Sequence, residues 1–312
     1  MPAGYEIPAR RRGSRQLAID LPGCDPSAKA IATGRARAGR MGVAMVRILR
    51  RVFLVLMLSA GIAAAAQGRE TAAADTAGTV LITGSDRGIG FELAKQYALR
   101  NWKVLATCRT PAHAQALAGL AASHPNVVIE ELDVTDVGEI EALAAKYAGT
   151  SIDVLINNAG IFGDVASQSL EELDYDDFVR VMAVNAFGPL KVSQAFIDHV
   201  AASRQKKIVT ITSGLASMTL TDNVRQGFYF YRASKASVNI ISRALAAELR
   251  GRKILVGLFN PGVVDTGFGA TGYAGPRLSP EQAATALVAF IETLNPDNAA
   301  TMINHDGTAM PW

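Results

Sequence analysis

The chain has 312 residues, of which 49% are hydrophobic and 19% are charged, and its formal net charge is +3. This composition fits a globular protein with a large core and argues against a disordered one. The charge is uneven: residues 1–66 hold eleven basic and three acidic side chains, and residues 67–312 hold twenty basic and twenty-five acidic ones. Because the larger part is net negative, charge gives no case for nucleic-acid binding. The two cysteines, Cys24 and Cys108, lie on either side of this divide, so no disulfide framework is implied.

The chain opens with a basic stretch that has no periodic pattern. Residues 1–44 are rich in Arg, Gly, Pro and Ala. They are predicted to be disordered, or to result from an upstream start codon with Met41 or Met45 as the true beginning. Residues 67–78 are small and polar and are predicted to be a linker to the domain that follows.

Between these segments, residues 45–66 have the pattern of a signal peptide or membrane anchor. A basic region precedes the apolar run Val52–Ala66, which ends in small residues before the polar Gln67. This order is typical of a secretory signal that is cleaved near Ala66. The run is short and Ala-rich for a membrane span, so a retained anchor and a buried apolar helix are the weaker alternatives.

From residue 79 onward, short apolar runs alternate with longer helical patterns. The predicted strands are Thr79–Thr83, Lys103–Cys108, Val127–Leu132, Ile152–Ile156, Lys207–Thr212, Ile254–Phe259 and Thr301–Asn304. The predicted helices are Ile89–Arg100, Val137–Tyr147, Asp174–Ala201, Tyr229–Arg250 and Pro280–Leu294. Continuous apolar strands between amphipathic helices predict a mainly parallel sheet that is covered on both faces. Because no boundary interrupts the pattern, residues 79–312 are predicted to form one doubly wound α/β domain of the Rossmann type, with about seven strands.

A glycine-rich turn follows the first predicted strand and opens the first helix. Its sequence, Thr83-Gly84-Ser85-Asp86-Arg87-Gly88-Ile89-Gly90, has the spacing G-x-x-x-G-x-G. Glycines are needed where the backbone turns tightly against a pyrophosphate, and the following helix N-terminus supplies N–H donors. This turn, first in an alternating chain, predicts a nucleotide-binding loop.

Tyr231 and Lys235 stand four residues apart in the run Phe228–Asn239, which contains no Pro or Gly. In a helix their side chains point from the same face, one turn apart. An ammonium at that distance favours the phenolate, so the pKa of Tyr231 is expected to fall toward neutrality. A phenol tuned in this way can act as a general acid or base, although an isolated pair of this kind is usually a surface feature.

These motifs together resemble a known family. The glycine spacing, Tyr231-x-x-x-Lys235, Asn157-Asn158-Ala159-Gly160 and Pro261-Gly262 are similar to those of the short-chain dehydrogenase/reductases, across residues 79–312. Within that family the chain looks most like the C-factor and sniffer-type carbonyl reductases. The stretches that carry this closer likeness are TGSDRGIG, ATCRTP, YRASKASVN and the ending Asp306–Trp312. The resemblance implies an oxidoreductase that uses a nicotinamide cofactor.

The resemblance also implies roles for four catalytic residues. Tyr231 would donate a proton to a carbonyl or accept one from an alcohol, and Lys235 would lower the pKa of Tyr231 and hold the ribose hydroxyls. Ser213 would hydrogen-bond the substrate oxygen, and Asn185 would hold a water that links Lys235 to solvent. On the residues alone, Ser213 could instead cap a turn, and Asn185 could mark a kink next to Gly188.

The charge at the end of the second predicted strand indicates the cofactor. An acid there would bind the ribose 2′-hydroxyl of NAD and repel a 2′-phosphate. The strand ends instead in Thr107-Cys108-Arg109, and Arg87 lies inside the glycine loop. Two guanidinium groups and no carboxylate predict NADP(H). No metal site is expected.

The resemblance adds further cofactor contacts. Asp133 would contact the adenine, or would only cap a helix, and Val263 and Thr266 would touch the carboxamide end. The complete predicted set is Gly84, Ser85, Arg87, Gly88, Ile89, Gly90, Arg109, Asp133, Val134, Asn158, Ala159, Gly160, Tyr231, Lys235, Pro261, Gly262, Val263 and Thr266. The Asn157–Asn158 pair could equally bind backbone between strands.

The substrate side carries less signal. Gly262–Ser279 is Gly-rich and suits a lid. The aromatic residues Phe228, Tyr229, Phe268 and Tyr273 would line an apolar pocket, or would only pack. The predicted substrate is an aldehyde, a ketone, a quinone or the corresponding alcohol. A non-catalytic NADP(H)-binding sensor on the same fold is the alternative. The resemblance also implies a homodimer or homotetramer.

The predicted signal and the predicted cofactor together constrain the route of export. Nicotinamide cofactors are made in the cytoplasm, so an enzyme threaded unfolded through a membrane would arrive without one. The stretch Leu49–Leu54, with its paired arginines, resembles the twin-arginine signal of proteins exported folded, although Leu49 and Val55 depart from that pattern. The domain is therefore predicted to be periplasmic by this route, or anchored in the inner membrane, and cytoplasmic if the signal is not used.

Overall fold

The structure is a computed structural model that describes residues 77–221, 227–268 and 273–312, all within one unit, Ala72–Trp312. The predicted N-terminal extension and signal segment lie outside the described residues, as does most of the predicted linker. None of the helices in the described ranges has both the length and the apolar character that crossing a membrane requires.

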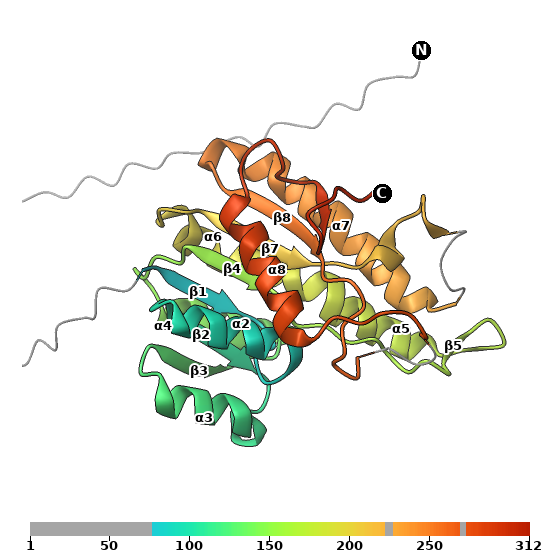
Figure 1. The fold of residues 1–312 in the computed structure, drawn as a ribbon, viewed down its shortest axis with the longest axis horizontal. Helices are drawn as coiled ribbons and strands as arrows, with labels where there is room; N and C mark the ends of the chain where they lie inside the picture. Colours follow the sequence, from blue (N-terminus) through green and yellow to red (C-terminus); the bar gives the residue numbers. More distant parts are fainter. Residues whose placement is uncertain (1–76, 222–226, 269–272) are drawn as a thin grey trace, which may run out of the picture. The chain divides into compact units, whose positions relative to one another are not determined.

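Within these ranges, seven strands form one sheet in the order β3-β2-β1-β4-β7-β8-β9 (Figure 1), and every neighbouring pair is parallel. The strands are β1 (Thr79–Ile82), β2 (Lys103–Cys108), β3 (Val127–Glu131), β4 (Val154–Asn157), β7 (Lys207–Ile211), β8 (Leu255–Asn260) and β9 (Met302–Asn304). Strands β1, β4 and β7 are buried along their whole length, which explains their continuous apolar sequences. The predicted Rossmann-type fold is confirmed.

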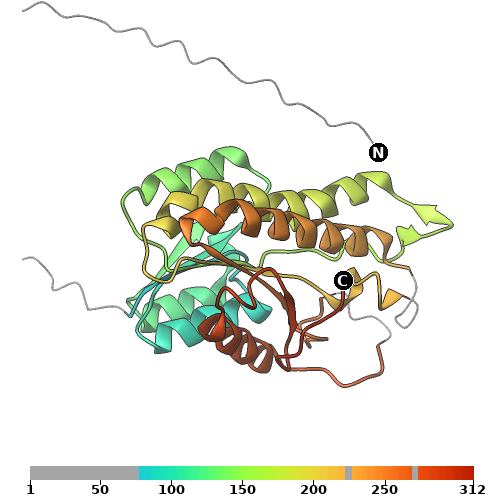
Figure 2. The ribbon, with the colours of Figure 1, turned by 90° about the horizontal axis from the view of Figure 1, so that it is seen from above.

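Helices cover both faces of this sheet, as the turned view shows (Figure 2). On one face lie α2 (Gly88–Leu99), α3 (Gln115–Ser123) and α8 (Pro280–Thr293), packed through Leu93, Leu117 and Leu287. On the other face lie α4 (Val137–Lys146), α6 (Gly188–Ala201) and α7 (Tyr229–Leu249), packed through Ile140, Phe196 and Leu249. The two faces therefore have separate cores on either side of one sheet.

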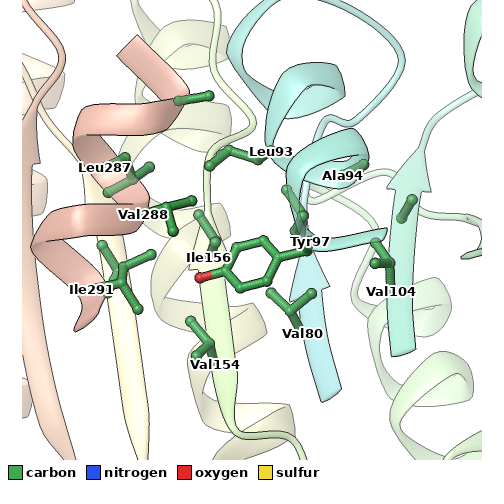
Figure 3. Packing of buried hydrophobic residues seen from close by; sticks show 14 of the residues in the cluster. Val80, Leu93, Ala94, Tyr97, Val104, Val154, Ile156, Leu287, Val288 and Ile291 are labelled. Carbon is green, nitrogen blue, oxygen red and sulfur yellow. The ribbon is translucent and has the colours of Figure 1, made fainter. Parts of the chain in front are cut away.

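Tyr97 on α2 shows how the first of these cores is filled. Its ring lies over β1 and β4, with Leu287, Val288 and Ile291 of α8 beyond it (Figure 3). Burial raises the pKa of the Tyr97 phenol far above its ordinary value, because the phenolate would lose its hydration there. This packing fixes α2 against β1, and so fixes the loop that joins them.

Three features differ from the predicted elements. The predicted helix Asp174–Ala201 is interrupted between α5 (Tyr175–Met182) and α6 by the π-helical turn η2 (Ala183–Phe187). One continuous helix was therefore wrong, because apolar periodicity does not reveal one wide turn. Helix α3 was not predicted, and neither was the short hairpin of β5 (Gln168–Ser169) and β6 (Glu172–Leu173).

The strand order reverses between β1 and β4, and this reversal locates the site. The chain runs outward from β1 through β2 to β3, then returns to pair β4 with the other edge of β1. In open α/β sheets, ligands bind at the carboxyl ends of the strands where the order reverses. The glycine loop follows β1 there, and Asn158–Gly160 follows β4.

Candidate active site

The glycine loop has a backbone that favours glycine. Gly84 and Gly88 have φ values of 68° and 57°. A Cβ at Gly90 would lie 2.1 Å from the Gly84 carbonyl oxygen and 2.5 Å from Asn158 Nδ2. Among the described residues no side chain caps the N-terminus of α2, and its first turn contains no acid. The loop and the helix end together can therefore stabilise a negatively charged group.

Asn158 and Thr83 tie the end of β4 to this loop. Asn158 Nδ2 donates to the carbonyl oxygens of Thr83 and Gly84, each at 2.8 Å. Thr83 Oγ1 accepts the N–H groups of Asn158 and Ala159, each at 3.0 Å. The sequence left two roles open for Asn158, contact with the cofactor or a bond to backbone between strands. Its side chain binds backbone. Thr83 was missed, and its position directly before Gly84 was the available signal.

The residues predicted to meet the adenosine end differ in exposure. Arg87 and Arg109 are exposed after β1 and β2. The Ser85 side chain is buried and donates to the Ile82 carbonyl at 2.9 Å, so only its backbone can meet a cofactor. Asp133 accepts from the N–H and the hydroxyl of Thr135, at 2.8 and 2.7 Å, so its side chain stabilises its own turn.

Carboxylates also lie near the end of β2, which corrects the predicted purely basic surroundings. Burial, and then the charge of Asp86, raise the pKa of the Cys108 thiol, and Glu131 adds to the effect. Asp86 belongs to the glycine loop, and Glu131 pairs with Cys108 across β2 and β3. A phosphate bound by the two arginines would therefore also face nearby negative charge.

Tyr231, Lys235 and Ser213 meet at the carboxyl end of β7. Lys235 Nζ lies 5.8 Å from the centroid of the Tyr231 ring and donates to the Ile211 carbonyl oxygen at 2.9 Å. The Ser213 side chain lies close enough to the Tyr231 phenol to act on its pKa. Ser213 Oγ also accepts the N–H of Leu215 at 3.2 Å, which caps the short helix η3 (Gly214–Ala216). Ser213 thus both caps a turn and contacts the phenol.

Burial dominates the titration of this cluster. It raises the pKa of Tyr231 to about 12, with the Ser213 hydroxyl acting in the opposite direction. It also lowers the pKa of Lys235 to about 8. The predicted fall in the Tyr231 pKa was wrong, because desolvation of the phenolate outweighs the groups that favour it. The sequence shows the spacing of the two residues but not their burial.

Asn185 lies at the centre of η2 and connects three parts of the site. Its Oδ1 accepts the N–H of Ile161 at 2.8 Å, and its Nδ2 donates to the Ile161 carbonyl at 2.7 Å and to Ser234 Oγ at 3.0 Å. Ser234 in turn donates to the Tyr231 carbonyl at 2.8 Å. A Cβ at Gly160 would lie 3.3 Å from Asn185 Oδ1 and 3.8 Å from Lys235 Nζ. The kink that the sequence allowed is therefore a π-helical turn with Asn185 inside it.

Aromatic rings cover Tyr231. Phe162 stacks on it, with the ring centroids 4.3 Å apart and the planes at 22°. Phe228 meets Phe162 edge-on at 5.0 Å, and Phe268 lies edge-on to Tyr231 at 5.9 Å. Phe162 was missed, and its place two residues after Gly160 was the only signal. An aromatic surface therefore borders the phenol.

The other two predicted pocket aromatics lie elsewhere. Tyr229 is exposed and lines an apolar hollow of about 380 Å³ with Phe178 and Leu173. A second hollow, of about 250 Å³, also lies beside Tyr229 and does not include Tyr231 or Ser213. Tyr273 is exposed, and its ring lies against Gly275. Neither tyrosine contributes to the aromatic cover of Tyr231 in the described contacts.

The segment after β8 returns toward the glycine loop. Pro261 is buried and Val263 is exposed. At Gly262, where φ is 76°, a Cβ would lie 2.6 Å from the His305 ring. The Thr266 methyl would lie 3.2 Å from a Cβ on Gly88, so Thr266 touches the loop. Residues 269–272 of the predicted lid lie outside the described residues.

The remaining predicted positions complete the edge of the crevice. Val134 is buried, and a Cβ at Gly188 would lie 3.0 Å from its side chain. Ile89 is partly buried in the first turn of α2 and packs against the core on that face. In the described ranges no three His, Cys, Asp or Glu side chains are placed to hold a metal ion. The site thus offers a phosphate cradle beside a buried phenol and ammonium.

A glycine loop at the strand reversal, next to a Ser–Tyr–Lys–Asn cluster, defines a Rossmann-type protein of the dehydrogenase class. The family model described as short chain dehydrogenase matches residues 78–274. The chain therefore belongs to the short-chain dehydrogenase family of oxidoreductases.

Individual relatives agree with this assignment. The C-signal protein of Myxococcus xanthus is 32% identical over 173 residues, which cover 55% of this chain and all of that protein. The NADPH-bound carbonyl reductase from chicken fatty liver is 31% identical, with a TM-score of 0.70 over 76% of this chain and 100% of that one. The carbonyl reductase Sniffer of D. melanogaster is 26% identical, with a TM-score of 0.68 over 75% of this chain and 99% of that one. The predicted likeness to C-factor and sniffer-type proteins is confirmed.

Proposed function

We propose that the chain is an NADP(H)-dependent carbonyl oxidoreductase that uses Tyr231 as its general acid or base. One observation carries the proposal: a buried phenol, one helical turn from Lys235 and close to Ser213, lies at the carboxyl edge of the sheet, where the glycine loop also lies. A pKa of about 12 keeps this phenol protonated at neutral pH, which is the form that donates a proton to a carbonyl oxygen.

The residues around the crevice fit a nicotinamide dinucleotide with a 2′-phosphate. The turn Gly84–Gly90 and the open N-terminus of α2 would hold the pyrophosphate. Arg87 and Arg109 would bind the 2′-phosphate, against the opposing charge of Asp86. When bound, this cofactor supplies or accepts the hydride. The NADPH-bound chicken enzyme supports the choice of cofactor.

The protein's own groups would manage the proton. Ser213 would hydrogen-bond the substrate oxygen, and Tyr231 would donate its phenolic proton to that oxygen as negative charge develops there. Lys235 would then stabilise the phenolate, since an ammonium nearby favours the charged form. We propose that Asn185 holds the water through which solvent returns the proton.

The test is NADPH consumption by the purified chain with aldehydes, ketones and quinones. Aromatic carbonyls are expected to react best, because Phe162 and Phe268 border the phenol. Consumption above background supports a reductase. Tight NADPH binding with no carbonyl-dependent consumption would instead support the alternative, a non-catalytic sensor of the cofactor.

We also propose that the protein works as a homodimer or homotetramer. Large apolar side chains are exposed on helices that pack together, with Val179 on α5, Phe187 in η2 and Ile240 on α7. Exposed apolar surface of this kind favours association. Light scattering after gel filtration measures the mass directly, and a monomer at micromolar concentration would oppose the proposal.

For localisation, we propose export of the folded domain by the twin-arginine route, with a retained inner-membrane anchor as the alternative. The support is the arginine pair Arg50 and Arg51 before the apolar run Val52–Ala66, in residues that lie outside the described ranges.

A further inference from the structure

Helix α7, which carries Tyr231 and Lys235, begins without a cap of its own. The residue before it, Phe228, is left-handed with φ of 59° and makes no side-chain cap hydrogen bond. The first N–H groups of a helix need acceptors from outside the helix. The N–H of Tyr231, in the first turn, donates instead to Gln168 Oε1 at 3.1 Å. A residue 63 positions earlier thus supplies the cap.

The other end of the same amide binds the backbone of Phe162, whose ring covers Tyr231. Gln168 Nε2 donates to the carbonyl oxygens of Phe162 and Asp164, at 2.9 and 3.2 Å. Phe162 is the residue whose ring stacks on Tyr231. Gln168 is 1% exposed, and all three of these hydrogen bonds use its side chain. One buried amide therefore fixes both the backbone of Tyr231 and the loop that places its aromatic neighbour.

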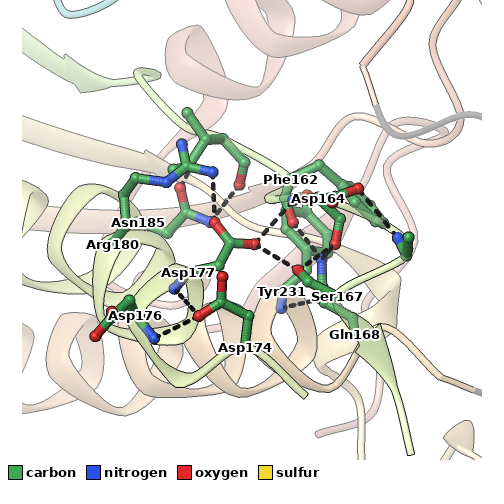
Figure 4. Close-up of polar contacts among 12 residues, drawn as sticks. Phe162, Asp164, Ser167, Gln168, Asp174, Asp176, Asp177, Arg180, Asn185 and Tyr231 are labelled. Carbon is green, nitrogen blue, oxygen red and sulfur yellow. Dashed lines mark hydrogen bonds and ion pairs between the residues drawn. The ribbon is translucent and has the colours of Figure 1, made fainter. Parts of the chain in front are cut away.

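Asp177 of α5 binds the same loop, the segment from Phe162 to Gln168, through other residues (Figure 4). Its carboxylate accepts the N–H of Asp164 at 2.8 Å and the hydroxyl of Ser167 at 3.1 Å, and it pairs with Arg180. Burial opposes its ionisation, but these hydrogen bonds and the Arg180 charge hold the pKa of Asp177 below its ordinary value. The loop is thus anchored to α5, and Gln168 carries that anchorage to Tyr231.

We propose that Gln168 is a positioning residue for the catalytic tyrosine: its amide caps α7 at Tyr231 and holds the Phe162 ring against the phenol. This inference rests on the proposed function, since it concerns the same phenol. Gln168 does not touch the phenolic oxygen, so it acts through the placement of Tyr231. Small misplacements of a reacting group can lower a rate by about 100-fold.

The test replaces Gln168 by Met, which has a similar length and no amide. Gln168→Glu keeps an oxygen acceptor for the Tyr231 N–H and is the conservative variant. Gln194→Met, at an exposed position on α6, is the matched control. Three quantities are measured in each protein: the exchange rate of the Tyr231 amide hydrogen, kcat and KM with NADPH and an aromatic aldehyde, and the Kd for NADPH.

In Gln168→Met the Tyr231 amide is expected to exchange about tenfold faster, because its cap is lost. We expect kcat to fall about 10- to 100-fold, with KM and the NADPH Kd within about threefold of the original. Gln168→Glu is expected to recover most of the amide protection and part of kcat. Gln194→Met should change none of these quantities.

Amide exchange needs no turnover, so the proposal and the proposed function can fail separately. No carbonyl-dependent turnover in the unaltered chain would refute the reductase and leave the exchange measurement to decide on the cap. An unchanged exchange rate at Tyr231 in Gln168→Met, or an unchanged kcat in an active enzyme, would overturn the positioning role. If Gln168→Met does not fold, Gln168→Glu decides instead: it keeps the acceptor for the Tyr231 N–H and loses the donors to Phe162 and Asp164. Loss of the amide protection in this variant would overturn the cap, and an unchanged kcat in an active enzyme would overturn the hold on Phe162.

Discussion

The Lys235 ammonium donates to the backbone carbonyl oxygen of Ile211 at 2.9 Å, while it lies 5.8 Å from the centroid of the Tyr231 ring. A carbonyl oxygen neutralises an ammonium less than a carboxylate does, so burial controls its titration and lowers the pKa of Lys235 to about 8. The same burial raises the pKa of Tyr231 to about 12. In this cluster the two groups are therefore both pushed toward their neutral forms.

This arrangement predicts how stability depends on pH. The folded pKa of Lys235, about 8, lies below its ordinary value of 10.5, so the buried charge destabilises the fold fully below pH 8. That cost, on the order of 3 kcal/mol, is relieved as pH rises from 8 to 10.5. Lys235→Met should therefore raise the Tm more at pH 7 than at pH 10. The check is a pair of melting curves at each pH, with exposed Lys191→Met as control. A gain in Tm that is equal at both pH values would contradict the burial argument.

Alanine should have opposite effects on stability at Gly90, in the glycine loop, and at Gly119, in helix α3. Gly90→Ala would place a Cβ 2.1 Å from the Gly84 carbonyl oxygen, so it should destabilise the fold by about 1–3 kcal/mol and abolish NADPH binding. At Gly119, inside α3, a Cβ would meet nothing within 4 Å. Gly119→Ala should therefore stabilise by about 0.5–1 kcal/mol and leave binding intact. Urea denaturation and NADPH fluorescence titration measure both effects. Equal stability of the two variants would show that the loop tolerates a side chain.

Cofactor preference depends on the two exposed guanidinium groups. The double variant Arg87→Ala with Arg109→Ala should lower kcat/KM for NADPH about 100-fold and change that for NADH less than threefold, since each hydrogen bond to a charged group is worth about 1.5–3 kcal/mol. The measurement is steady-state kinetics with each cofactor. Arg100→Ala, at an exposed position after α2, is the control. An unchanged preference would mean that the 2′-phosphate binds elsewhere.

The sequence predicts this architecture well where a pattern repeats. The strand positions of β1, β2 and β9 were correct to within one residue, because buried parallel strands are continuous apolar runs. Motif spacing likewise predicted that Tyr231 and Lys235 lie one turn apart on one helix, as they do on α7. The sequence could not show the features that depend on contacts between distant segments. The Gln168 cap on Tyr231 joins residues 63 positions apart, and the Phe162 stack joins a loop to helix α7.

Burial was the other quantity that the sequence did not contain. The spacing of Tyr231 and Lys235 suggested a lowered phenol pKa, whereas desolvation decides the opposite direction. In the same way, Ser85 lies in the predicted nucleotide loop but points into the protein, toward the Ile82 carbonyl. A motif gives the position of a side chain along the chain and not the direction in which it points.

Export by the twin-arginine route predicts sensitivity to a charge-conserving change. Arg50→Lys with Arg51→Lys keeps both charges and removes only the guanidinium pair. Cells that express this double variant should retain the protein in the cytoplasm, as measured by fractionation and blotting. Arg47→Lys, in the same basic region, is the control. Unchanged delivery to the periplasm would contradict the twin-arginine route and leave a general secretory signal or an anchor as the explanation.

The central claim is that Tyr231 donates the proton, and Tyr231→Phe tests it most directly. The variant removes one hydroxyl and leaves the ring to stack on Phe162. Tyr175→Phe, an exposed tyrosine on α5, is the control. Stopped-flow turnover with an aromatic aldehyde, together with NADPH titration, should show kcat lowered at least ~100-fold with cofactor affinity within about threefold. Turnover equal to that of the unaltered chain would contradict the account.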